Sequence, residues 1–183
     1  MVRSILVFAL ITGSIFVSSM FGQAARDWQK VTSAEGGFEA LFPSAPARTT
    51  TLVDSATGKV PTTMFTSSFD DRAFLVSYSD YDVDITDPFD ALVRSQTGGI
   101  TTVGGTLVSS AATRHAGYPA RVYTVRVEPQ NGPSMIISVK AVLVGRRLYQ
   151  TAVVYAEANG QPAEYARFAS AFRIQGTGIT AVR

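Results

Sequence analysis

The sequence predicts an α+β fold in which an antiparallel β-sheet is flanked by helices. Apolar and polar residues alternate at every second position over much of the chain, which is typical of half-buried strands. The connections between these segments are too short for crossover helices, so neighbouring strands are expected to run antiparallel. Two further segments have apolar residues at helical spacing. The 183 residues suit a single domain.

Seven segments have the alternation expected of strands, and turn residues separate them. Asp70-Asp71 is expected to form a tight turn between two of these strands, and Gly145-Arg146 another. A short strand around 172–174 is expected near the end of the chain. The seven longer segments are 38–42, 48–54, 60–69, 73–81, 123–128, 135–143 and 148–157.

The first helix is expected to begin after Asp87-Pro88. Aspartate is a favourable N-cap, and proline fits the first position of a helix. Gly98-Gly99 predicts the end of this helix. The segment 99–106 is expected to be a loop.

The second helix is expected to begin at Pro162. Its apolar residues fall at positions i, i+3, i+4 and i+7, so they would share one face. They are Tyr165, Phe168, Ala169 and Phe172. Helices that cover an antiparallel sheet define the α+β class.

Residues 1–24 have the pattern of a signal peptide that is removed on export. Arg3 precedes an uncharged, mostly apolar stretch, and the small residues Gly22 and Ala24 suit a signal peptidase. Cleavage is expected after Ala24, which leaves 25–183 as one domain, secreted or in the periplasm. The alternative is an uncleaved membrane anchor, although the apolar stretch is shorter than a typical span and contains polar residues.

The composition excludes several kinds of site. The chain has no cysteine, so disulfides, thiolate zinc sites and cysteine nucleophiles are excluded. Its one histidine, His115, rules out a multi-histidine metal site and is the only imidazole available as a general base. The formal net charge of +2 gives no reason to expect nucleic-acid binding.

An acidic run between positions 70 and 90 is the most distinctive feature of the sequence. Asp80, Asp82 and Asp84 alternate, and a hard cation such as Ca²⁺ prefers clustered carboxylates. A calcium loop starting at Asp80 would need glycine and glutamate where Ile85 and Ala91 stand, so this cation site is a candidate only and no metal is expected. Turn and capping roles explain the same run, which consists of Asp70, Asp71, Asp80, Asp82, Asp84, Asp87 and Asp90.

Arg146, Arg147 and His115 are candidate contacts for a partner or ligand. The arginine pair is expected at a hairpin tip, where two guanidinium groups could hold a carboxylate or phosphate. His115 is expected in an exposed loop, because turn residues surround it. No Gly-x-Ser-x-Gly elbow surrounds a serine, so no catalytic residue is assigned. The alternative is a secreted hydrolase that uses an Asp pair, or a Ser together with His115.

Three short motifs are spread over most of residues 28–175. They are Trp28 with Gly36-Gly37-Phe38-x-Ala40-x-Phe42-Pro43-x-x-Pro46, then Gly117-Tyr118-Pro119-Ala120-Arg121, then Phe168-Ala169-Ser170-Ala171-Phe172-Arg173-Ile174. The motifs resemble those of PsbP-like domains, in particular the exported bacterial members. This resemblance implies an α-β-α sandwich around an antiparallel sheet, the fold shared with the Ran-binding nuclear-import factor. It also implies a non-enzymatic role, as an extrinsic subunit, an adapter or a ligand-associated protein of the cell envelope.

The sequence therefore predicts an exported, non-enzymatic domain that binds a protein partner or an apolar small ligand in the cell envelope. No cofactor and no nucleic-acid partner are expected. Contact with a membrane is expected only if the leader stays uncleaved.

Overall fold

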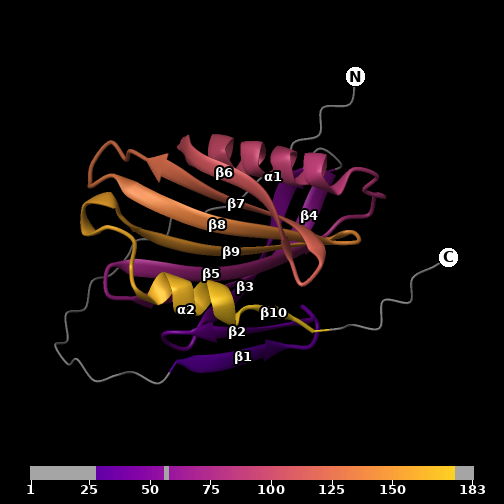
Figure 1. Cartoon of the computed structure of the whole chain (residues 1–183), viewed down its shortest axis with the longest axis horizontal. Helices are drawn as coiled ribbons and strands as arrows, with labels where there is room; N and C mark the ends of the chain where they lie inside the picture. The colour runs from indigo at the N-terminus through magenta and orange to yellow at the C-terminus, as the bar shows by residue number, and fades with distance from the viewer. Residues whose placement is uncertain (1–27, 56–57, 176–183) are drawn as a thin grey trace.

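Antiparallel strands form a seven-stranded main sheet and a separate three-stranded sheet, which Figure 1 shows below it. The computed structural model describes residues 28–55 and 58–175, so the leader predicted at 1–24 lies outside the described residues. The main sheet has the order β3-β4-β5-β9-β8-β7-β6. Its strands are β3 (Ala47–Ser55), β4 (Gly58–Phe69), β5 (Arg72–Asp80), β6 (Thr106–His115), β7 (Tyr118–Val127), β8 (Met135–Val144) and β9 (Arg147–Ala156).

The three-stranded sheet joins the two ends of the described chain. Its order is β1-β2-β10, and both pairings are antiparallel. The strands are β1 (Gln29–Ser33), β2 (Phe38–Phe42) and β10 (Arg173–Ile174). The segment 38–42 is a strand, as predicted, but it lies in this second sheet rather than beside its sequence neighbour β3.

All seven predicted longer strands are confirmed, while β1 and β6 were not predicted. β6 has exposed residues on both faces, so it lacks the alternation of apolar and polar residues that indicates a half-buried strand. The predicted loop at 99–106 is wrong, because its first part is helical and Thr106 begins β6. The tight turn at Asp70-Asp71 is confirmed, since the Arg72 N–H donates to the Asp70 carbonyl at 2.8 Å.

Helix α1 (Pro88–Val103) begins where the sequence predicted and ends later. The Asp87 carboxylate accepts hydrogen bonds from the N–H groups of Phe89 and Asp90, at 3.1 and 3.0 Å. The predicted stop at Gly98-Gly99 is wrong: both glycines are buried inside the helix. The helix ends instead at Gly104, whose φ of 61° is the left-handed conformation that glycine adopts without strain.

Helix α2 (Glu164–Ala171) is shorter than predicted. It begins two residues after Pro162 and ends before Phe172, which has extended backbone. Phe168 and Phe172 are each only 1% exposed, so both still reach the core. A short 3-10 helix, η1 (Glu157–Asn159), connects β9 to this region.

The two helices lie on opposite sides of the main sheet (Figure 1). On the α1 side, a buried cluster includes Leu92 of the helix and Tyr123, Val139 and Leu148 of the sheet. On the other side, α2 and the three-stranded sheet bury a cluster rich in aromatic rings, among them Phe38, Phe42, Phe74, Phe168 and Phe172. In the described part of the chain, no helix is long and apolar enough to span a membrane.

Candidate functional site

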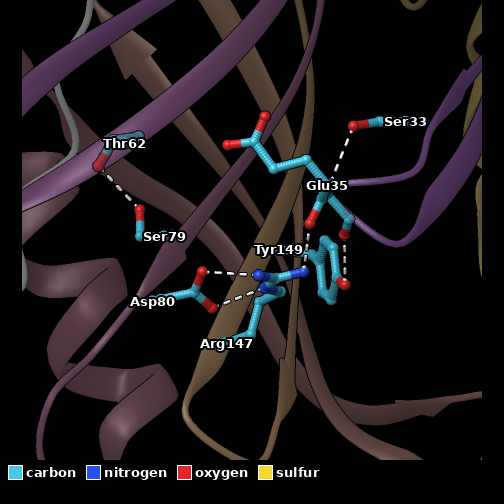
Figure 2. Close-up of polar contacts among 8 residues, drawn as sticks. Ser33, Glu35, Thr62, Ser79, Asp80, Arg147 and Tyr149 are labelled. Carbon is cyan, nitrogen blue, oxygen red and sulfur yellow. Dashed lines mark hydrogen bonds and ion pairs between the residues drawn. The ribbon is translucent and has the colours of Figure 1, made fainter. Parts of the chain in front are cut away.

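Arg147 holds the turn between β1 and β2 against the end of the main sheet (Figure 2). It is the first residue of β9, directly after the Gly145-Arg146 turn. Its Nε and Nη2 donate to the two carboxylate oxygens of Asp80, each at 2.6 Å, and its Nη1 donates to the Glu35 carbonyl at 3.0 Å. The guanidinium also lies 5.1 Å from the centre of the Tyr78 ring, within cation–π range.

Gly36 completes this contact between the two sheets. Its N–H donates to Ser33 Oγ at 2.9 Å, and its carbonyl accepts from the Tyr149 hydroxyl at 2.7 Å. A Cβ at Gly36 would lie only 2.8 Å from ring carbons of Phe38, so a side chain does not fit there without a shift. The turn at 34–37 is therefore fixed by hydrogen bonds from Arg147 and Tyr149 of β9.

The electrostatics of this cluster are those of a structural ion pair. The hydrogen bonds that Arg147 donates to Asp80 raise the pKa of Arg147, while burial lowers it less strongly. Arg147 thus stays charged at neutral pH. Nearby, Arg48 of β3 forms an exposed ion pair with Glu35, and this contact raises the Arg48 pKa.

The two predicted arginines have different environments. The Arg146 side chain is exposed at the turn and has no partner among the described residues, while its carbonyl accepts from the Tyr81 N–H at 3.0 Å. The Arg147 side chain is engaged with Asp80 and Glu35. Of the pair, only Arg146 is free to contact a ligand.

The acidic run is spread over several separate roles. Asp80 binds Arg147, Asp87 caps α1, and Asp90 forms an ion pair with Arg94 one helical turn away. Asp82 and Asp84 are exposed in the segment between β5 and α1. Among the described residues, no three His, Cys, Asp or Glu side chains form a group that could hold a metal ion. Asp80 already has a cationic partner in Arg147.

His115 lies at the end of β6, and the predicted exposed loop is wrong. The turn that follows consists of only Ala116 and Gly117, both with positive φ. Because this turn is so short, the pairing of β6 with β7 continues up to His115, which lies opposite Tyr118. The ring is half-buried, with its centre 5.5 Å from that of Phe172. Burial lowers the His115 pKa, and the positive charges of Lys140 and Arg173 lower it further.

The surroundings of His115 include an aromatic ring and two cations. Its buried Nε2 has no hydrogen-bond partner, and no serine or aspartate within the described ranges hydrogen bonds to the ring. The two nearby cations instead contact the C-terminal end of α2. Lys140 Nζ donates to the Ala169 carbonyl at 2.9 Å, and Arg173 Nη1 donates to the carbonyl of Phe172 at 3.0 Å. Cations are favourable at this end of a helix.

Strand β6 is an open edge of the main sheet that sequence reasoning missed. It has ten residues, and all are exposed except the half-buried His115. Arg114 is its only charged residue at neutral pH. Ser110 contacts the body of the protein on the α1 side, where its hydroxyl donates to Gln96 at 2.8 Å.

The register shows which backbone groups of β6 face the open edge. Arg114 lies opposite Pro119 of β7, and proline has no N–H to donate. The Arg114–Pro119 pair is therefore a non-hydrogen-bonded pair of the ladder. This fits the two-residue turn at 116–117, because the pair that flanks such a turn, His115–Tyr118, is hydrogen-bonded and the next pair is not. By alternation, Ser110 and Ala112 also direct their N–H and C=O groups away from β7.

The opposite edge of the sheet, β3, carries more charge. Arg48 near its start pairs with Glu35, and Asp54 near its end pairs with Lys59 at 2.9 Å. Charged residues on edge strands discourage pairing with another chain. The two open edges therefore differ in how well they are protected.

The comparison with solved structures identifies the fold. The structure of the cyanobacterial PsbP from Synechocystis sp. PCC 6803 matches with a TM-score of 0.54 and 19% identity, over 86% of this chain and 98% of that one. The chain has the PsbP fold. The resemblance of the three sequence motifs to PsbP-like domains is thus confirmed at the level of the fold.

Other comparisons add little to the PsbP assignment. A protein of unknown function from Pseudomonas aeruginosa matches with a TM-score of 0.42 and 13% identity, over 72% of this chain and 85% of that one. No family model and no curated protein matches the chain. The structural likeness therefore shows the fold, and a fold by itself does not specify a function.

Proposed function

We propose that the chain is an exported, non-enzymatic domain, built as an α-β-α sandwich, that binds a protein partner by strand addition at β6. The leader pattern at 1–24 supports export to the cell envelope. The observation that carries the binding role is the open edge of β6, with its row of outward N–H and C=O groups. An extended segment of a partner can complete such a row and continue the sheet.

The composition of β6 favours binding over a passive edge. Natural edge strands are usually protected by charges, prolines or a covering element, because an open edge pairs with other chains. The segment 109–113 has no charge and no proline, since it contains only serine, alanine and threonine, and all five residues are exposed. Its small side chains add little bulk beside the outward backbone groups. The β-bulge between Leu107 and Ser109 protects only the start of the strand.

A proline substitution on each edge tests the proposal. Ala112→Pro removes an N–H that faces the open edge, so it blocks an added strand without removing a hydrogen bond to β7. Leu52→Pro is the matched control on β3, because Leu52 lies opposite Pro61 and therefore also directs its N–H outward. Both variants should remain folded, which a thermal melt followed by circular dichroism checks.

The binding assay is affinity capture from the native envelope fraction with the wild type and both variants. We expect a partner that the wild type and Leu52→Pro retain and Ala112→Pro loses, and we expect bound partner to slow amide exchange in β6. A partner that all three proteins capture equally would refute binding at this edge. The intact mass of the exported chain tests the leader, with cleavage after Ala24 as the expected result.

A further inference from the structure

We propose that β6 also pairs antiparallel with β6 of a second copy of this chain, which joins two main sheets into one continuous sheet. This inference rests on the proposed function, because it requires that β6 accepts an added strand. It names the occupant of the edge, and three features of the strand and its surroundings support that choice.

The first feature is the position of charge along the edge. A parallel pair would place the two Arg114 side chains beside each other, whereas an antiparallel pair moves each Arg114 towards the start of the other β6. There, Thr106 lies opposite Arg126, which interacts with the carboxylates of Glu157 and Glu128. Two acids around one arginine leave a net negative charge at that end, so an antiparallel copy is electrostatically complementary.

The second feature is the size of the side chains at the centre of β6. In a two-fold symmetric pair, the residue on the axis meets its own copy, so a large or charged residue there would clash or repel. The axis falls at Ser110, Ala111 or Ala112, depending on the register, and all three side chains are small. The centre of β6 is therefore compatible with itself.

The third feature is the difference between the two edges. Pairing of β6 with β3 of another copy would be head-to-tail, and such contacts close only as rings of several copies or continue into filaments. The ion pairs of Arg48 and Asp54 on β3 oppose this arrangement. Pairing of β6 with β6 uses the unprotected edge on both copies and closes after two chains.

The size of the interface predicts a weak dimer. A single pair of strands buries less surface than the standard interface of a stable complex, although Leu107 and Val108, which are 44% and 51% exposed, would add apolar contact. The full exported chain should therefore shift from monomer to dimer with increasing concentration in sedimentation velocity. Leu52→Pro should show the same shift, and Ala112→Pro should remain monomeric.

Single cysteines give a direct test, because the chain has no cysteine of its own. Ser110→Cys, Ala111→Cys and Ala112→Cys each place one thiol near the expected axis, and Thr51→Cys places the control thiol on β3. Under mild oxidation we expect a disulfide-linked dimer for at least one β6 variant, at a rate well above that of Thr51→Cys. The variant that cross-links fastest defines the register.

The outcomes separate this inference from the proposed function. A wild type that stays monomeric at every concentration, together with β6 cysteines that cross-link no faster than Thr51→Cys, would overturn the dimer. If Ala112→Pro still loses its envelope partner in that case, strand addition stands and only the second copy is wrong. If Ala112→Pro retains the partner, both proposals fail.

Discussion

Replacing Arg147 by alanine should release the turn at 34–37 from the main sheet and destabilise the protein. Besides a longer approach to the Tyr149 ring, at 6.0 Å, the structure gives this side chain three closer contacts. They are the two-pronged ion pair with Asp80, the hydrogen bond to the Glu35 carbonyl, and the position over the Tyr78 ring. All three disappear with the guanidinium. The expected loss in the free energy of unfolding is about 2–3 kcal/mol, the sum of three modest terms.

The magnitude of each term follows from its exposure and geometry. The ion pair is partly in water, since the side chains of Arg147 and Asp80 are 21% and 56% exposed, so it contributes only about 0.5–1 kcal/mol. The hydrogen bond from the charged group to the Glu35 carbonyl contributes about 1 kcal/mol. The cation–π contact with Tyr78 adds about 0.5–1 kcal/mol. For a chain of this size, each kcal/mol lowers Tm by about 2–4 °C.

Urea unfolding of Arg147→Ala, Arg147→Lys and Arg146→Ala measures these terms. Arg146 is the matched control, because it is the adjacent arginine and its side chain has no partner in the described part of the chain. Arg146→Ala should stay within about 0.5 kcal/mol of the wild type. Arg147→Lys should fall between the wild type and Arg147→Ala, because lysine keeps the charge but not the two-pronged geometry.

Amide exchange locates the effect. Arg147→Ala should speed exchange in β1 and β2 more than in the centre of the main sheet, since its contacts join the two sheets. The reasoning fails if Arg147→Ala and Arg146→Ala lose equal stability, or if exchange in β1 and β2 is unchanged.

Two further predictions concern His115 and Asp87. Burial, Lys140 and Arg173 lower the His115 pKa below its ordinary 6.5, so the unfolded chain binds the proton more readily than the folded one. The stability that comes from a neutral His115 is therefore present above pH 6.5 and is lost as pH falls through the folded pKa. The urea midpoint of His115→Gln should therefore fall less than that of the wild type between about pH 7.5 and about pH 5; an equal fall in both proteins would contradict the assignment. Asp87→Ala should cost about 1 kcal/mol through loss of the N-cap of α1, whereas exposed Asp84→Ala should cost almost nothing, and thermal melts that rank them in the opposite order would exclude the capping role.

The fold could be predicted where the signal is local. The start of α1 follows from Asp87-Pro88, because capping depends only on residues two and three positions away. The end of α1 could not be predicted in the same way. Gly98 and Gly99 have the composition of a helix stop, but they are buried within α1, and the stop is the left-handed Gly104. The same residue type ends a helix or continues it according to what packs around it.

The candidate site depended much more on tertiary contacts. Asp80 was considered as a cation ligand and Arg147 as an anion ligand, and the fold brings these opposite charges together across 67 positions. His115 was expected in a loop, but the turn after it tolerates Ala116 at positive φ and lets β6 reach the histidine. No local sequence pattern predicts the Asp80–Arg147 ion pair or the position of His115 at the end of β6.

By itself, the sequence determined the α+β class, the seven longer strands that it predicted, the beginning of α1, the absence of thiol chemistry and the expectation of export. These depend on periodicity, capping and composition, which act over a few neighbouring residues. Only the tertiary structure decided that 38–42 belongs to a second sheet, that Asp80 is the partner of Arg147, and that β6 is an open edge. An edge strand exposed on both faces has no hydrophobic period to read, so its existence follows only from pairing with β7.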